Sequence, residues 1–132
     1  MKIGTTSVYV DDQEKALRFY TEVLGFQKKA DFSNGTFRWL TLVSPEQPDG
    51  VELQLGSNAN PAGKAYQEAL FQQKQPALRL YVDDVQREVE RLKAKGATFD
   101  MPPTKVTGST IATLQDTCGN LVQLVSLEAR RG

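Results

Sequence analysis

The feature that most constrains the fold is a four-residue word that occurs twice, because YVDD at residues 9–12 returns at residues 81–84. A glycine follows each of the two helical patterns after these words, as Gly25 and as Gly96. Self-similarity at a fixed offset is the signature of one structural unit used twice. We therefore predict two similar modules that can curve around a shared cleft.

The pattern around each copy predicts a βαβββ module. Alternating apolar and polar residues precede each YVDD word, which is typical of a half-buried strand. Asp12 can cap the helix that follows, and Gly25 can end it in the left-handed conformation. The first module is predicted to hold strands at 2–10, 26–32, 37–43 and 51–55; the second holds a strand at 78–82, a helix at about 85–95, and strands near 98, at 110–115 and at 121–127.

These modules account for the whole chain as one domain. Residues 1–55 form the first module, residues 56–76 a connector with a short helix, and residues 77–132 the second module. The connector helix begins at Pro61, and its apolar residues are Ala65, Tyr66, Ala69, Leu70 and Phe71. We expect an α+β fold whose tandem βαβββ modules form a curved mixed sheet around a cleft. The helices should lie on the outer face, since one strand parity collects the apolar residues Val8, Leu40, Leu42, Leu53, Leu80, Val122 and Leu124.

The composition excludes several classes of partner. Sixteen basic and sixteen acidic residues leave no net charge, so neither nucleic acid nor an anionic membrane is an expected partner. No apolar run reaches the roughly 20 residues that a membrane span needs, and the first residues lack a signal-peptide core. The single cysteine, Cys118, fits a reducing compartment. We therefore expect a cytoplasmic protein with a small organic ligand.

Four segments carry a family resemblance that extends over essentially the whole chain. They are residues 10–12 (VDD), 15–20 (KALRFY), 23–26 (VLGF) and the late turn 116–120 (DTCGN). In these segments the chain resembles the vicinal-oxygen-chelate superfamily, which includes glyoxalases, bleomycin-resistance proteins and extradiol dioxygenases. The resemblance implies a homodimer, with modules paired within a chain or exchanged through the connector. It does not fix the reaction, since one fold hosts many functions.

The resemblance also implies where a metal would bind in metal-dependent relatives. The four ligand positions fall at Thr5, Glu52, Ala77 and Gln123, and the whole chain contains no histidine. Zinc, nickel and non-haem iron sites need several imidazole or carboxylate donors, of which only Glu52 remains. We therefore expect no tightly bound metal and no cofactor, although one carboxylate with neutral oxygens leaves room for a weakly held divalent cation.

Strand alternation predicts which side chains line the cleft. The set combines aromatic walls with a few polar groups, which is typical of a small-molecule pocket. The alternative is that the aromatic residues are ordinary core residues and the polar ones face solvent. The predicted lining is Thr5, Ser7, Tyr9, Phe37, Trp39, Thr41, Glu52, Gln54, Arg79, Tyr81, Thr113 and Gln123.

Among these residues Glu52 is the catalytic candidate. Arg79 is expected near Glu52, and two arrangements are open. Either the two side chains form a structural ion pair, or Glu52 stays unpaired and desolvated and acts as a metal-free general base. Cys118 has no histidine to activate it, which argues against a nucleophilic thiol. Asp12 and Asp84 are interpreted as helix caps at the strand ends.

The leading hypothesis is a protein that binds and sequesters an aromatic or antibiotic-like compound, as the resemblance to bleomycin-resistance proteins implies. The alternative is an enzyme. It would be a glyoxalase-like lyase or isomerase, or a dioxygenase, using Glu52 as a base or a weakly held divalent metal. A third hypothesis, a structural interaction protein, would show a filled cleft.

Overall fold

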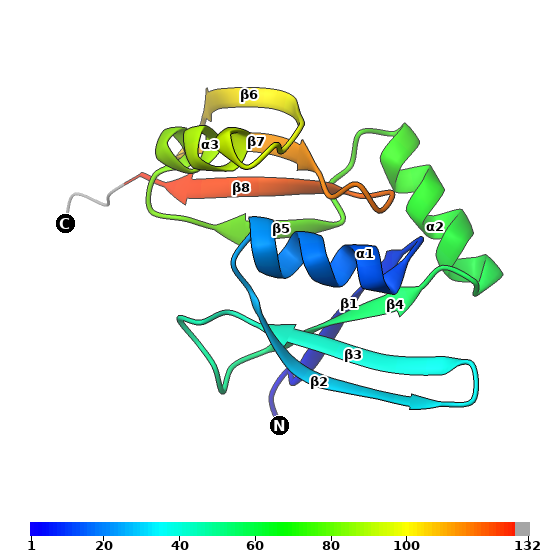
Figure 1. Cartoon of the computed structure of the whole chain (residues 1–132). Helices are drawn as coiled ribbons and strands as arrows, with labels where there is room; N and C mark the ends of the chain where they lie inside the picture. Colours follow the sequence, from blue (N-terminus) through cyan, green and yellow to red (C-terminus); the bar gives the residue numbers. More distant parts are fainter. Residues whose placement is uncertain (129–132) are drawn as a thin grey trace.

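The computed structural model describes residues 1–128 and contains eight strands in two groups of four within that range (Figure 1). The order along the chain is that of two βαβββ modules joined by a helix, and the predicted α+β fold is confirmed. The elements are β1 (Thr5–Val10), α1 (Gln13–Arg18), η1 (Phe19–Val23), β2 (Gln27–Asn34), β3 (Phe37–Val43), β4 (Glu52–Ser57), α2 (Pro61–Gln72), β5 (Leu78–Tyr81), α3 (Val85–Ala94), β6 (Phe99–Val106), β7 (Ser109–Gln115) and β8 (Leu121–Leu127).

The strands form two separate four-stranded sheets rather than one continuous curved sheet. The N-terminal sheet has the order β1-β4-β3-β2 and the C-terminal sheet the order β5-β8-β7-β6. Both sheets are mixed. The pair β1–β4 and the pair β5–β8 are parallel, while the other pairs are antiparallel. Strands β1 and β5 each pair along one side only, so each sheet keeps an open edge within the described chain.

Local capping sets the ends of the module helices as the sequence predicts. Asp12 accepts a hydrogen bond from the backbone N–H of Lys15 at 3.0 Å, and Asp84 does the same for Arg87 at 3.1 Å. This bond lowers the pKa of Asp12. After the helices, Gly25 has a φ of 90°, a left-handed value that favours glycine.

The end of the first helix departs from the predicted 3.6-residue period. Residues 19–23 form a π-helical turn, in which the N–H of Leu24 donates to the carbonyl oxygen of Phe19 at 3.2 Å. Phe19 and Tyr20, at the start of this turn, are both buried. The turn therefore presents two adjacent aromatic rings to the core.

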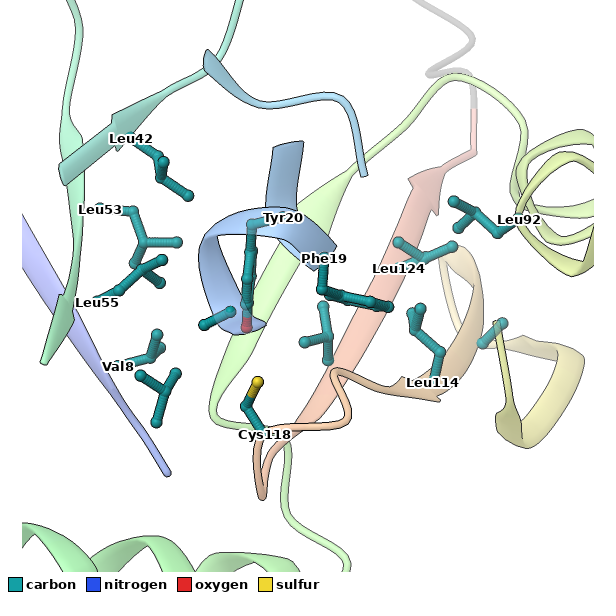
Figure 2. Close-up of a cluster of buried hydrophobic side chains, with 14 of the residues drawn as sticks. Val8, Phe19, Tyr20, Leu42, Leu53, Leu55, Leu92, Leu114, Cys118 and Leu124 are labelled. Atoms are coloured by element: carbon teal, nitrogen blue, oxygen red, sulfur yellow. The ribbon is translucent and has the colours of Figure 1, made fainter. Parts of the chain in front are cut away.

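One hydrophobic core joins the two modules. The apolar strand residues that were predicted to face the helices are buried in this core. The exception is Leu80, which is half-buried and packs against the core. Figure 2 shows Phe19 and Tyr20 between Val8, Leu53 and Leu55 of the first sheet and Leu114 and Leu124 of the second. Because both sheets turn their helix faces toward this core, their opposite faces, here called the open faces, look away from it.

The connector helix α2 is seated differently from the prediction. Its buried residues are Gly63 and Gln67, while Tyr66 remains 60% exposed and Ala65 and Ala69 are also exposed. A Cβ atom at Gly63 would come within 2.5 Å of the Tyr9 ring, so only glycine allows this close approach. The helix is therefore held by close backbone packing and by polar contacts, not by its apolar stripe.

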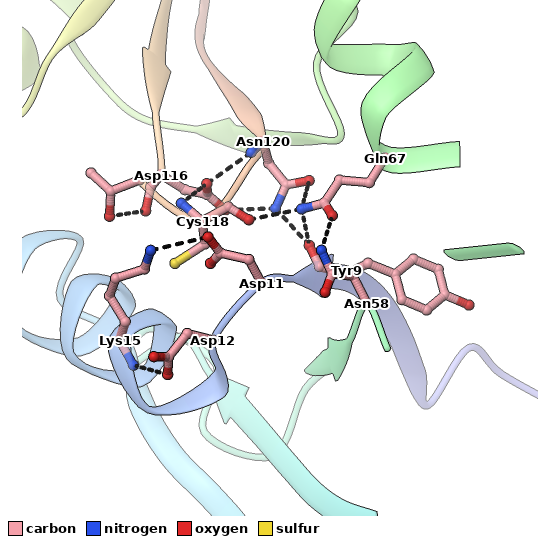
Figure 3. A network of polar contacts seen from close by, with 10 residues as sticks. Tyr9, Asp11, Asp12, Lys15, Asn58, Gln67, Asp116, Cys118 and Asn120 are labelled. Atoms are coloured by element: carbon pink, nitrogen blue, oxygen red, sulfur yellow. Dashed lines mark hydrogen bonds and ion pairs between the residues drawn. The ribbon is translucent and has the colours of Figure 1, made fainter. Parts of the chain in front are cut away.

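Those polar contacts form a network that ties both modules to the connector (Figure 3). Gln67 Nε2 donates to the carbonyl oxygens of Tyr9 at 2.9 Å and Cys118 at 2.8 Å. Asn120 Nδ2 donates to the same Tyr9 oxygen and to the buried carboxylate of Asp116, both at 2.7 Å. The network fixes the end of β1 against the turn before β8.

No helix within residues 1–128 is both long and apolar enough to cross a membrane.

Candidate functional site

The open face of the N-terminal sheet carries eight of the twelve predicted cleft residues. Strand register places Ser7 opposite Gln54, and Gln54 opposite Thr41. Residues in such positions point to the same face of a sheet. The eight residues are Thr5, Ser7, Tyr9, Phe37, Trp39, Thr41, Glu52 and Gln54.

Two short hydrogen bonds order the polar side chains of this face. Ser7 Oγ donates to Gln54 Oε1 at 2.7 Å, and Thr41 Oγ1 donates to Glu52 Oε1 at 2.6 Å. Thr41 is fully buried, whereas Glu52 and Gln54 are half-buried. The face therefore presents side chains held in fixed directions, which is what a binding surface requires.

A hollow of about 440 Å³ lies over one end of this face. Four of the predicted residues line it, namely Ser7, Tyr9, Phe37 and Gln54. The ring of Phe37 is 55% exposed there. The remaining lining comes from Thr36, Arg38, Gly56, Ser57, Ala59 and Asn60.

The sequence analysis missed one aromatic residue on the open face. Phe32 lies opposite Trp39 in the β2–β3 hairpin and is 62% exposed. The pairing shifts between Lys28 and Ala30, so simple alternation from the start of β2 assigns the wrong parity beyond that point. Counting backwards from the turn at Gly35 would have placed Phe32 on the face of Trp39.

The other four predicted residues lie on the C-terminal sheet. Arg79 Nε donates to Gln123 Oε1 at 3.1 Å, and Thr113 lies opposite Gln123 on the next strand. Tyr81 is 64% exposed. Arg79 and Tyr81 border a second hollow of about 610 Å³, whose other walls include Leu24–Phe26 and Ser44–Gln47 of the first module.

Within one chain the twelve residues therefore do not share one cleft. Arg79 does not pair with Glu52 as expected, because each finds a partner on its own sheet, Gln123 and Thr41 respectively. The physical reason is the common core, which turns the open faces of the two sheets away from each other.

The four positions inferred for a metal are also split between the sheets. Thr5 lies opposite Glu52 on the N-terminal sheet, whereas Gln123 lies on the C-terminal sheet and Ala77 just before β5. Among residues 1–128 no three His, Cys, Asp or Glu side chains gather into a group that could hold a metal ion. One carboxylate, one hydroxyl, one amide and an alanine do not fit a zinc, nickel or iron site.

Cys118 and Asp116 are structural in this fold. Burial raises the pKa of the Cys118 thiol to about 12, so it stays protonated and unreactive at neutral pH. Burial also raises the pKa of Asp116, while bonds from Asn120, Cys118 and Tyr20 oppose that shift. The same burial, together with the neighbouring Asp116, raises the pKa of Tyr20 well above its usual value.

The fold is that of a known superfamily. The sequence model of the Glyoxalase/Bleomycin resistance protein/Dioxygenase superfamily matches residues 2–124, and the chain belongs to this superfamily. The resemblance seen in the sequence is thereby confirmed.

The chain is also similar to individual proteins and solved structures. The chain is 54% identical over 125 residues to the uncharacterized protein YurT of Bacillus subtilis (strain 168), covering 95% of this chain and 98% of YurT. Among solved structures, UcmS2 is similar with a TM-score of 0.82 at 28% identity, covering 95% of this chain and 97% of UcmS2. TnmS3, an antibiotic-binding protein from Streptomyces sp. CB03234, has a TM-score of 0.76 at 27% identity, covering 97% of each chain.

Proposed function

We propose that this protein binds and sequesters a small aromatic or antibiotic-like molecule on the open face of the N-terminal sheet, without a tightly bound metal. The observation that carries the proposal is the combination of solvent-exposed aromatic rings and ordered polar side chains on one sheet face. Phe32 and Phe37 are more than half exposed on the sheet face that also carries the ordered pair of Ser7 and Gln54. Exposed aromatic residues around a few fixed polar groups are typical of ligand sites. The similarity to the antibiotic-binding TnmS3 supports this class of ligand.

The site is completed in a homodimer, in which the open face of one chain's N-terminal sheet meets the C-terminal sheet of a second chain. The open edges of β1 and β5 support this arrangement, as do the exposed apolar residues Tyr81 and Leu127 on the C-terminal open face. In a monomer these exposed apolar residues would stay in contact with water, which is unfavourable. Sedimentation velocity should give a dimer at micromolar concentration, and a monomer under these conditions would refute the arrangement.

An enzyme is the second candidate, and Glu52 is the residue that favours it. Its Oε1 accepts the bond from Thr41, and within residues 1–128 its Oε2 has no hydrogen-bond partner. A half-buried carboxylate with one free oxygen on a ligand-binding face has the geometry of a general base.

Binding and turnover assays with one panel of aromatic metabolites and antibiotics separate the two functions. Trp39 is the only tryptophan and lies on the open face, so its fluorescence should change when a ligand binds. Glu52→Gln should leave binding intact if the protein is a sequestering protein, and should abolish turnover if it is an enzyme.

Two outcomes of these assays would count against specific parts of the proposal. Ligands that bind without altering the Trp39 signal would move the site off this face. For anionic ligands, Arg79→Ala should weaken binding by about 1.5–3 kcal/mol if a charged hydrogen bond crosses the dimer. An unchanged affinity would remove the C-terminal sheet from the site.

A further inference from the structure

The hollow over the N-terminal sheet has an unusual hydrogen-bonding polarity. Three of its polar side chains use their acceptor atoms inside the protein. Gln54 Oε1 accepts from Ser7 at 2.7 Å, Ser57 Oγ accepts from the N–H of Ala59 at 3.1 Å, and Asn60 Oδ1 accepts from the N–H of Ala62 at 2.9 Å. A backbone N–H can only donate, so the atom of Asn60 that it meets must be the amide oxygen. The NH₂ end of the Asn60 side chain is therefore the end that turns outward.

What these side chains leave for a ligand is a set of donors. Gln54 and Asn60 each keep an NH₂ group, and Ser57 keeps its hydroxyl proton. Within residues 1–128 neither NH₂ group has a hydrogen-bond partner. A ligand group that contacts these two NH₂ groups therefore accepts hydrogen bonds from them.

The hollow offers this ligand group no free charge. Arg38 is the one charged residue in the lining, and its guanidinium pairs with Asp31 and with Glu14, both at 2.8 Å. Glu52, on the same sheet face, adds a nearby negative charge that disfavours an anion. The accepting group is therefore expected to be neutral, as a carbonyl oxygen is.

Two aromatic rings, those of Tyr9 and Phe37, line the hollow. The ring of Tyr9 lies against Gly56 and Gly63, which hold it at the edge of the hollow. Phe37 projects from the adjacent hairpin and is more than half exposed. Two rings around a donor-rich centre match a flat ligand that carries its acceptors in the plane of its rings.

We infer that the N-terminal half of the site recognises an uncharged aromatic ketone or quinone, whose carbonyl oxygen accepts hydrogen bonds from the amide groups of Gln54 and Asn60. The inference rests on the proposed function and names the ligand class for that same site. Ser7 is a positioning residue, since its hydroxyl holds the Gln54 amide with its NH₂ group toward the ligand.

A matched pair of probes tests the inference. 9-Fluorenone and fluorene share one planar skeleton and differ by the carbonyl oxygen, and equilibrium dialysis gives the affinity of each. The wild-type protein should bind fluorenone about fivefold to tenfold more tightly, the value of roughly one neutral hydrogen bond. Fluorene-2-carboxylate, the anionic probe, should bind more weakly than fluorenone, and tighter binding would overturn the assignment to an uncharged ligand.

Two conservative variants assign the preference to the donors. Asn60→Asp keeps the oxygen that caps α2, and Gln54→Glu keeps the oxygen that Ser7 needs, but each loses its NH₂ group. Each should reduce the preference for fluorenone at least threefold while fluorene binding stays unchanged. Ser7→Ala should reduce the same preference by a smaller factor, because the amide is then free to turn. Gln75→Glu, which makes the same charge change in the exposed connector, should have no effect.

The outcomes separate this inference from the proposed function. If fluorene and fluorenone bind equally, or the variants leave their ratio unchanged, the donor assignment is wrong while aromatic binding stands. If none of the three probes binds, both the ligand class and the proposed aromatic site are overturned.

Discussion

The buried contact between Tyr20 and Asp116 should contribute strongly to stability, because it crosses between the modules and supplies one of the hydrogen bonds that hold a buried carboxylate. Tyr20 Oη donates to Asp116 Oδ2 at 2.9 Å, and both residues are fully buried. Asn120 Nδ2 donates to the same oxygen, and the backbone N–H groups of Cys118 and Asn120 donate to the other. Tyr20→Phe removes one of four donors and almost no volume. A hydrogen bond to a charged group contributes about 1.5–3 kcal/mol, so the free energy of unfolding should fall by that amount at pH 7.

The pH dependence of this loss is the sharper test. Burial raises the folded-state pKa of Asp116 above 3.8, so the folded protein takes up this proton before the unfolded chain does as the pH falls. Removing a donor raises that pKa further, so the variant gains more relative stability than the wild type on acidification. The difference should therefore shrink as the pH falls, because a protonated carboxyl makes the weaker bond.

Urea denaturation at pH 7 and pH 4, at equal protein concentration, measures both values. Tyr66→Phe, on the exposed side of α2, is the matched control and should change stability by less than about 0.5 kcal/mol. A loss below 0.5 kcal/mol for Tyr20→Phe at pH 7, or one that does not fall with pH, would refute this reasoning.

Three further outcomes are expected. Gly63→Ala should destabilise the protein by about 1–3 kcal/mol through overpacking against the Tyr9 ring. The control Gly4→Ala, with no atom within 4 Å of its new Cβ, should not destabilise it. Equal shifts of the melting temperature in the two variants would contradict this. The Arg38 guanidinium lowers the pKa of Asp31 to about 2, so the stability that this pair contributes is present above pH 4 and is lost between pH 4 and 2. Carboxyl NMR of Arg38→Gln should show Asp31 titrating near its ordinary value. An unmoved pKa of Asp31 would exclude Arg38 as the cause. Elemental analysis of protein purified without chelator should find well under one zinc, nickel or iron per chain, and about one would overturn the argument from the donor set.

Local signals in the sequence predicted most of the fold. The caps at Asp12 and Asp84 and the left-handed glycines depend only on neighbouring residues, so their types and spacing are enough. The π turn at residues 19–23 and the seating of α2 were not predictable this way. The position of α2 depends on Gln67 reaching the carbonyl oxygens of Tyr9 and Cys118, contacts between segments far apart in the chain.

The candidate site shows the same division. Alternation correctly indicated that Ser7, Tyr9, Phe37 and Gln54 share one face, and the structure brings them to one hollow. It could not indicate which sheet this face meets, because that depends on how the two modules pack. Arg79 therefore borders a different hollow in this chain. The dimer, the ligand and the cytoplasmic location stay predictions.

The location of a bound ligand tests the central claim most directly. In the ¹H–¹⁵N NMR spectrum of the protein saturated with 9-fluorenone, or with another aromatic ligand from the panel, the side-chain amides of Gln54 and Asn60 and the backbone amide of Ser7 should shift most. The indole signal of Trp39, on the same face, should shift with them. Shifts confined to residues 44–47 and α3, around the other hollow, would contradict the proposal that the open face of the N-terminal sheet is the binding site.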